Sequence, residues 1–476
     1  MSDEPPMEDF TRKPGAPEIR SGARGFRVKK MCVTVAASFL ALSPVGCKKS
    51  DPSPTTMASA ATSSAVPAMA SASVVAESLP RCRVEGARLA IPGDDIVAGD
   101  AAVTSDALLV GVVRREGARR IASLVRASLD LGTMRVIDVG AALGDDPPPS
   151  PRMHGATAFV TSFARPKGGA DAGGMTRVLE VARVEATGLV VEGSVVQQAD
   201  ESLAYDVAWP VEADKGPPLV AWDEDAPPRG TALLADHGVV KVQLLGAGAK
   251  ARVASPETSD AEAPRLLARR GGYWLAWLAR RPEAREDVDA AAEGPGERRT
   301  YRWVELVALD AKGEPTSPVR RVSPEKGRVA SFDLAAGTGG AGDAQLVVIV
   351  QDEAAHAEGA GERIARYAID GEKTETGDLL DGGLGHALAE LLLPPLAPQT
   401  DASASRWLAF TDTQEHAHLV PLGPALRLAG RPTLEPSLDG TRIVASASPD
   451  VVYAIGSAGP ADAAGGRVEL RRLVCR

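Results

Sequence analysis

The sequence predicts an all-β fold for residues 81–476, and three observations carry this prediction. Short apolar runs, rich in Val, Leu and Ala, recur along this region between clusters of Gly, Pro and Asp, as in chains built from strands and tight turns. The chain has 48 Gly and 36 Pro against 7 Phe, 6 Trp and 5 Tyr, so turns are frequent and aromatic platforms are few. The runs also fall into repeated units, which indicates one structural motif used several times.

The residues before this region differ from it. Residues 1–23 are polar and Pro-rich, so we expect either a disordered segment or a start codon further in. Residues 24–47 have the pattern of an export signal, in which a basic stretch ending FRVKK precedes the apolar stretch MCVTVAASFLAL. That apolar stretch is shorter than the roughly 20 residues that a membrane-spanning helix needs.

A cysteine closes the signal. The motif SPVGC places Cys47 directly after the small residues Val45 and Gly46. This motif resembles the lipobox of bacterial lipoproteins, whose cysteine is diacylated and becomes the mature N-terminus, although Pro44 stands where lipoboxes usually have Leu. The resemblance implies lipidation of Cys47 and attachment to a membrane surface. Ordinary cleavage that yields a secreted protein, and a retained signal anchor, are the alternatives.

Residues 48–80 follow with Ser, Ala, Thr, Pro and Met and hardly any charge after Asp51. Such a segment buries too little apolar surface to offset its chain entropy, so we expect a flexible tether with a mean reach of roughly 30 Å.

Seven units of predicted strands fill the rest of the chain. The clearest unit, residues 271–322, reads GGYWLAWLARR, then an acidic insertion at 283–297, then YRWVELVALDAKGEPTSPVRRV. The predicted strands are 107–113, 119–129 and 134–139; 157–163, 177–184 and 189–196; 203–209, 219–222, 232–235 and 239–245; 273–278, 301–309 and 319–322; 329–334, 346–350 and 363–369; 407–411, 418–422 and 426–428; and 443–446, 451–455 and 467–474.

Each unit is typical of a meander of three or four antiparallel strands. Small sheets repeated radially make a β-propeller, which leaves only short, protected strand edges. From residue 81 on the chain resembles propeller proteins in general, which implies a single β-propeller of about seven irregular three- to four-stranded blades. Tandem β-sandwich domains are the alternative fold. Residues 384–393, LGHALAELLL, are predicted as either a short helix or a buried strand.

The cysteines bear on how the predicted domain closes. Cys32 lies within the export signal, so Cys82 and Cys475 are the cysteines left at the two ends of the folded region. Each ends a strand-like run, CRVEGARLA or RVELRRLVC. In many propellers the N-terminal strand completes the last blade, so we expect these runs to pair and the two cysteines to form a disulfide in an oxidising compartment. Two unpaired thiols are the alternative.

Motifs that carry chemistry are scarce, and we assign no catalytic, cofactor-binding or metal-binding residue. Residues 337–342 read GxGxxG, but a strand follows where a dinucleotide site needs a helix, so we expect a Gly loop. His416 and His418 alternate as paired metal ligands would, but no third ligand is near, so we expect a solvated turn. The remaining acidic clusters lack the order of a calcium loop and are predicted as solubilising loops. They are 223–225, 287–289 and 352–353.

These features predict a non-catalytic lipoprotein of the bacterial cell envelope that acts as a binding or scaffold domain. The alternative is an envelope hydrolase or lyase that acts on polysaccharide or peptide; an enzyme should gather polar side chains, including two or more histidines, from several blades. The formal charge of −10 argues against nucleic acid as a partner. The expected partners are a membrane surface, through the lipid, and an envelope protein or glycan. We expect a monomer that is lipid-anchored in the cell envelope, at the outer membrane or facing the periplasm, with secretion as the alternative. The insertion 283–297 is the first loop to mutate.

Overall fold

The computed structural model describes most of the region predicted to fold. It describes residues 82–142, 146–164, 177–197, 204–211, 216–225, 238–246, 248–280, 302–325, 327–336, 346–352, 363–371, 373–381, 390–392, 406–411, 417–423, 427, 433–434, 441–448, 450–458 and 467–475. Regular structure in these residues is all β-strand, as the sequence predicts. Within the same ranges, no helix is long and apolar enough to cross a membrane.

The described strands form seven sheets, which we number in chain order. The first sheet contains β3 (Asp94–Val103), β4 (Ala107–Glu116), β5 (Arg119–Ser128) and β6 (Met134–Ala141). The second contains β7 (Ser150–His154), β8 (Thr157–Ala164), β9 (Arg177–Val184) and β10 (Leu189–Gln197). The third contains β11 (Tyr205–Ala208), β12 (Leu219–Asp225), β13 (Gly238–Leu244) and β14 (Arg252–Val253).

Three further sheets repeat this four-stranded order. The fourth contains β15 (Asp260–Arg269), β16 (Gly272–Arg280), β17 (Trp303–Asp310) and β18 (Arg320–Arg321). The fifth contains β19 (Val329–Ala336), β20 (Leu346–Asp352), β21 (Arg363–Asp370) and β22 (Lys373–Asp381). The sixth contains β23 (Glu390–Leu392), β24 (Arg406–Thr411), β25 (Ala417–Leu422) and β26 (Thr433–Leu434).

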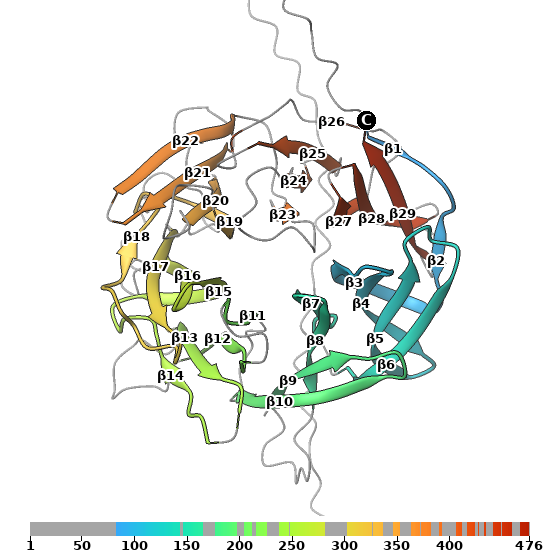
Figure 1. The fold of residues 1–476 in the computed structure, drawn as a ribbon, viewed down its shortest axis with the longest axis horizontal. Helices are drawn as coiled ribbons and strands as arrows, with labels where there is room; N and C mark the ends of the chain where they lie inside the picture. The colour runs from blue at the N-terminus through green and yellow to red at the C-terminus, as the bar shows by residue number, and fades with distance from the viewer. Residues whose placement is uncertain are drawn as a thin grey trace, which may run out of the picture. The chain divides into compact units, whose positions relative to one another are not determined.

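The seventh sheet joins the two ends of the described chain. It contains β1 (Cys82–Val84), β2 (Leu89–Ile91), β27 (Thr441–Ser448), β28 (Val451–Ala458) and β29 (Arg467–Cys475). Figure 1 shows the blue strands β1 and β2 beside the red strand β29, with which both pair antiparallel. The pairing of N- and C-terminal strands predicted from the sequence is therefore present, and a disulfide between Cys82 and Cys475 fastens it with an S–S distance of 2.06 Å.

Neighbouring sheets share hydrophobic cores, which explains why the middle strands are apolar on both faces. In β4, every residue from Ala107 to Val113 is buried, because Leu108 packs toward the seventh sheet while Leu109 packs toward the second. A strand covered on both faces reads as a continuous apolar run instead of an alternating one. The fourth strand β6 has mixed burial, consistent with a less covered position.

The same pattern of shared cores runs through the sheets. Common clusters join the second sheet to the third, the third to the fourth, the fourth to the fifth and the sixth to the seventh, and β19 of the fifth sheet contacts β23 of the sixth. The largest of these clusters is built around Trp277, which is 0 % exposed and donates Nε1–H to Glu305 Oε2 at 3.1 Å.

Most of the predicted strands are confirmed, but β3, β7, β15 and β22 lie where no strand was predicted. The segment 384–393 contributes the strand β23 at its end, and its earlier residues lie outside the described ranges. The prediction of a strand at 426–428 is wrong at Arg427, and the last strand of the sixth sheet is β26. The strand predicted at 232–235 lies outside the described residues.

The buried tyrosines Tyr453 and Tyr273 make a matched test of the packing between sheets. Tyr453 of the seventh sheet donates its hydroxyl to the carbonyl oxygen of Leu129, beyond the end of β5, at 2.7 Å. Tyr273, which is 0 % exposed in the fourth sheet, has no hydrogen-bond partner for its hydroxyl among the described residues, and burial raises the pKa of that hydroxyl to about 12.

We expect Tyr453→Phe to lower the free energy of unfolding by about 1 kcal/mol, because the Leu129 carbonyl loses its donor. Tyr273→Phe should leave stability unchanged or raise it slightly, because an unpaired buried hydroxyl is removed. Urea-denaturation midpoints of the two variants measure the difference. Equal losses in both would contradict the contact between the seventh and first sheets.

Candidate functional site

Polar side chains on the first strands of several sheets converge on one another. The first strands are those that begin each run of consecutive strands in a sheet, among them β3, β7, β11, β15 and β19, together with β27 of the seventh sheet. We call the group of linked side chains on β3, β7, β11 and β27 the first-strand cluster. Five members, Asp100, Ser150, Arg152, Asp206 and Arg442, are joined by hydrogen bonds or ion pairs, and Tyr205 interacts electrostatically with Asp100, Arg152 and Asp206.

Asp100 lies at the centre of the first-strand cluster. Its Oδ2 accepts a hydrogen bond from Ser150 Oγ at 2.7 Å and lies 3.3 Å from Arg152 Nη2. Its Oδ1 lies 3.5 Å from Arg442 Nη2 of the seventh sheet. One carboxylate therefore connects the first, second and seventh sheets.

Local irregularities in the backbone place this carboxylate. The pairing of β3 with β4 shifts between Ala98 and Ala101, so Gly99 and Asp100 form a β-bulge. Bulges re-aim side chains and are frequent beside functional sites. Gly99 also leaves room for Pro148, whose Cβ would stand 2.8 Å from a Cβ at that glycine.

A second glycine brings the start of the second sheet against the first. A Cβ at Gly111 of β4 would overlap the carbonyl oxygen of Pro149. Only a glycine permits so close an approach of two backbones. The next residue after Pro149 is Ser150, so this approach sets its hydroxyl against Asp100.

Asp206 is held by the backbone. Its Oδ1 accepts the N–H of Val207 at 2.9 Å, and its Oδ2 accepts the N–H of Leu266 in β15 at 2.8 Å. Arg152 Nη2 is 3.8 Å from Oδ1, so the guanidinium lies between the carboxylates of Asp100 and Asp206. With a side chain only 10 % exposed, Asp206 serves to position its neighbours and to fix the third sheet on the fourth.

Tyr205 adds a neutral hydroxyl beside these charges. Its Oη donates to the carbonyl oxygen of Thr161 in β8 at 3.2 Å. Burial raises the pKa of Tyr205, and the negative charge of Asp100 raises it further, so the phenol stays protonated. Tyr205 is therefore a hydrogen-bond donor and not a base.

The charges of the first-strand cluster balance one another. Burial by itself raises the pKa of Asp100, but Arg152, Arg442 and the Ser150 hydroxyl together lower it to about 2. Burial likewise lowers the pKa of Arg152, and Asp100 and Asp206 reverse that effect and raise it. Arg265 of β15 also favours the ionised form of Asp100, so charges from the fourth sheet act on the same point.

Water reaches the first-strand cluster although several sheets surround it. The side chains of Asp100, Arg152 and Arg442 are 35 %, 39 % and 37 % exposed. Solvent screening at such exposure reduces the energy of each ion pair. A group that is fixed by several sheets and still open to water is suited to binding a polar ligand.

Asp100 should make stability depend on acidity. Its pKa in the folded chain is below its ordinary value of 3.8, so its ion pairs stabilise the fold above that value, and this contribution is lost as the pH falls from about 5 toward 2. Asp100→Asn should therefore be less stable than the unmodified chain at pH 7, with the gap closing across this window. Denaturation midpoints measured at a series of pH values test this; Asp95→Asn, which removes an exposed pair with Arg115, is the control. A gap independent of pH would contradict the assigned ion pairs.

The structure tests only some of the residues singled out in the sequence. Cys82 and Cys475 form the predicted disulfide. His418 lies on β25, where its ring stacks on Phe410 with centroids 4.7 Å apart. Among the described residues, no group of three or more His, Cys, Asp or Glu is placed to hold a metal ion. Outside those residues lie Cys47, 337–342, His416, 283–297 and 287–289.

The prediction of a solubilising loop at 223–225 is wrong. Asp223 and Glu224 are 2 % and 3 % exposed on β12. Glu224 accepts Nε1–H of Trp222 at 3.0 Å and pairs with Lys241 Nζ, while Asp223 Oδ2 accepts the N–H of Ala263 at 2.7 Å. Burial is possible because each carboxylate has a hydrogen-bond donor.

The first-strand cluster itself is absent from the sequence-based predictions. Its strands β3 and β7 read DDIVAGDAAV and SPRMH, which contain no long apolar run. Asp100 and Arg152 are polar residues within strand-like sequence, and this pattern could have pointed to the site. One histidine, His154, lies at the end of β7, where its ring stacks on Trp209 with centroids 5.7 Å apart.

Comparisons with known proteins give likenesses of low identity. No family model and no curated protein matches the chain. Polysaccharide lyase Uly1 is 10 % identical to this chain with a TM-score of 0.44, and the match covers 80 % of this chain and 90 % of the lyase chain. The β-propeller domain of the Trilobed protease from Pyrococcus furiosus is 9 % identical with a TM-score of 0.41, covering 80 % and 94 %.

A third likeness is to a larger protein. A prolyl endopeptidase is 12 % identical with a TM-score of 0.40 over 76 % of this chain, which spans 46 % of that protein. The chain therefore covers less than half of that relative. At these TM-scores the assignments below rest on the residues of this chain alone.

Proposed function

We propose that this chain is a non-catalytic, lipid-anchored binding domain of the bacterial cell envelope, folded as a closed β-propeller of seven blades. The ligand is an acidic glycan or peptide, held at the first-strand cluster. The observation that carries this proposal is the convergence of Asp100, Arg152 and Arg442 from three sheets, with a third or more of each side chain open to water.

Closure of the propeller is supported by contacts between the last sheet and the first. Arg442 pairs with Asp100, Tyr453 bonds to Leu129, and a shared core includes Leu108 and Leu470. Each sheet also has a neighbour before and after it in the chain, whereas tandem sandwiches would pack sheets in separate pairs. Tyr453→Phe, proposed above, tests this closing contact.

The chemistry of the ligand follows from the exposed arginines. A guanidinium carries five N–H donors and binds carboxylates in a two-pronged geometry. Both ion pairs of Arg152 are made by Nη2, and 39 % of its side chain is open. The carboxylate and hydroxyl oxygens of a ligand would accept hydrogen bonds from the N–H groups of Arg152 that are not used in its two ion pairs.

Binding to an array of uronate-containing oligosaccharides, neutral oligosaccharides and acidic peptides tests this assignment. Arg152→Gln and Arg442→Gln should each weaken binding of an acidic ligand at least about tenfold, because a charged hydrogen bond is lost. Arg321→Gln, which breaks the exposed pair with Glu325, is the control and should bind normally. Absence of any acidic ligand, or equal binding by all variants, would refute the proposal.

An enzyme is the second candidate, and one observation favours it. Asp100 and Tyr205 belong to one cluster but to different sheets, and they supply an ionised carboxylate and a protonated phenol. A hydrolase or lyase acting on polysaccharide or peptide needs such polar groups in one place. Product formation from a polysaccharide panel, abolished in both Asp100→Asn and Tyr205→Phe, would favour this candidate over the binding domain.

The membrane anchor is proposed from the signal alone. Acylated Cys47 would hold the domain at the membrane, with Lys48 and Lys49 beside the headgroups and 48–80 as tether. Mass spectrometry of the mature protein should find a lipidated Cys47 at the N-terminus, and Cys47→Ser should move the protein to the soluble fraction. A mature chain that begins elsewhere would refute the anchor.

A further inference from the structure

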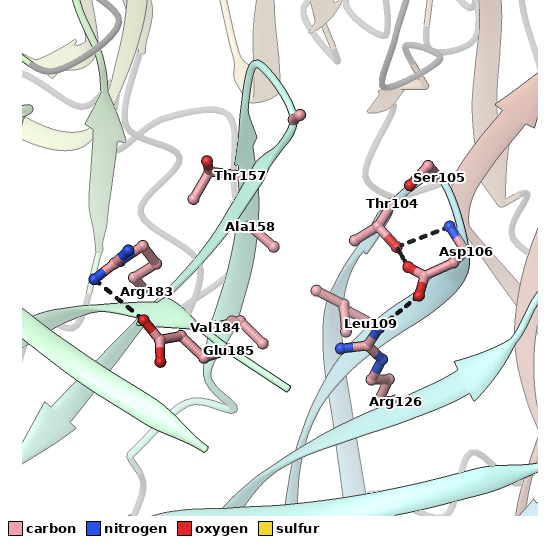
Figure 2. A pocket seen from close by; sticks show the side chains of 11 residues that line it. Thr104, Ser105, Asp106, Leu109, Arg126, Thr157, Ala158, Arg183, Val184 and Glu185 are labelled. Carbon is pink, nitrogen blue, oxygen red and sulfur yellow. Dashed lines mark hydrogen bonds and ion pairs between the residues drawn. The ribbon is translucent and has the colours of Figure 1, made fainter. Parts of the chain in front are cut away.

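A pocket separate from the first-strand cluster lies between the first and second sheets. Its volume is about 280 Å³, and Figure 2 shows side chains of both sheets facing each other across it. The lining comes from the turn between β3 and β4, from β4 and β5, from the start of β8 and from the end of β9. The lining residues are Thr104, Ser105, Asp106, Leu109, Arg126, Ala156, Thr157, Ala158, Arg183, Val184 and Glu185.

The wall from the first sheet is fixed by its own turn. Thr104 Oγ1 accepts the N–H of Ala107 at 2.9 Å and donates to Asp106 Oδ1 at 2.7 Å. Asp106 Oδ2 pairs with Arg126 Nη2 at 2.7 Å. The hydrogen bond from Thr104 also lowers the pKa of Asp106, which stays ionised. Donor and acceptor groups on this wall are therefore held in place before a ligand arrives.

The wall from the second sheet has a similar pair. Arg183 donates Nε–H to Glu192 at 2.9 Å, and its Nη2 lies 3.2 Å from Glu185 Oε1. The side chains of Arg183 and Glu185 are 42 % and 41 % exposed. In Figure 2 they stand opposite Asp106 and Arg126.

The charges of the lining are paired, and its apolar residues expose little surface. Leu109 is 0 % exposed and Ala158 is 7 % exposed. The two arginines of the lining pair with three carboxylates, those of Asp106, Glu185 and Glu192, so an anion is not favoured. The volume is just below the roughly 300 Å³ at which drug-sized ligand pockets begin, so the occupant is small.

We propose that this pocket binds one ring of a neutral sugar. A pyranose or furanose ring is small and uncharged, which suits the volume and the paired charges of this pocket. Its hydroxyl groups both donate and accept, which suits the carboxylates and guanidinium groups of the two walls. A charged ligand would instead leave one member of each ion pair without a suitable partner. This site is independent of the acidic ligand proposed for the first-strand cluster.

Titration of the full mature chain with methyl glycosides of glucose, galactose, mannose and arabinose, followed by ligand-observed NMR, tests the site. At least one glycoside should saturate in the millimolar range, which is typical of a single small ligand with few contacts. Asp106→Ala and Arg183→Ala should each weaken that binding at least about tenfold, since each removes a charged partner of the hydroxyls. Arg321→Ala is the control and should bind as the unmodified chain does.

A third variant fills the pocket without touching the core. Ala156 is an exposed turn residue on the rim, so Ala156→Trp should fold normally and abolish binding. Arg152→Gln should leave glycoside binding unchanged, which separates this site from the first-strand cluster. The proposal is overturned if no glycoside saturates, if Ala156→Trp still binds, or if glucuronate or glutamate binds more tightly than every neutral glycoside.

Discussion

Replacing Cys82 and Cys475 together by serine is expected to lower the free energy of unfolding by about 4 kcal/mol. The two cysteines are 393 residues apart in the sequence, and a crosslink across so long a loop restricts the unfolded chain strongly. The chain-entropy formula gives about 6 kcal/mol, and measured losses for native disulfides are usually about 2–5 kcal/mol. Urea denaturation of the oxidised chain and of the double variant measures the difference.

The reduced, unmodified chain is the matched control for this variant. It should unfold at the same urea concentration as the double serine variant, because both lack the crosslink. Loss of the disulfide should raise the amide hydrogen-exchange rates most in β1 and β2. These two strands are held in the seventh sheet by β29 and by the disulfide. An oxidised chain no more stable than the reduced one would contradict the assigned role of the bond.

Gly111→Ala is expected to cost about 3 kcal/mol or more, the upper range for overpacking. The added methyl group would overlap the carbonyl oxygen of Pro149, which is backbone and has little freedom to move. Relief of the overlap should push 146–150 away from β4 and separate Ser150 from Asp100. The variant should therefore lose both stability and part of the acid dependence predicted for Asp100.

Gly140→Ala in β6 is the control, because a Cβ there has no heavy atom within 4 Å. It should be neutral or slightly stabilising, since alanine loses less backbone entropy than glycine on folding. Thermal denaturation of both variants, with ligand binding at the first-strand cluster as a second readout, tests the pair. Equal stability of Gly111→Ala and Gly140→Ala would show that the second sheet does not approach β4 as described.

Much of the fold was predictable from the sequence because its middle strands are apolar. Runs such as LLVGVV in β4 and YWLAWL in β16 are buried against sheets on both sides, and such runs stand out in any scan for hydrophobic segments. The pairing of Cys82 with Cys475 was predictable for a different reason: each of these cysteines ends a strand-like run at one end of the predicted domain.

The candidate site was not predictable by the same route. Asp100 and Ser150 are 50 residues apart and meet through Gly99, Gly111 and Pro149, a relation that no local spacing encodes. Polar residues also lower the hydrophobicity of β3 and β7, so a scan for hydrophobic runs omits two of the four strands that carry the site. Buried acids such as Glu224 were misassigned because a charged partner, here Lys241, lies on another strand.

The seventh sheet has a consequence for the order in which the molecule is made. Synthesis proceeds from the N-terminus, so β1 and β2 are the first described strands to leave the ribosome and their partner β29 is the last. These two short strands therefore have no pairing partner until the strands of the six other sheets have been synthesised. A chain that stops before residue 467 would therefore keep unpaired strand edges and a free Cys82 thiol, and unpaired edges favour aggregation and degradation.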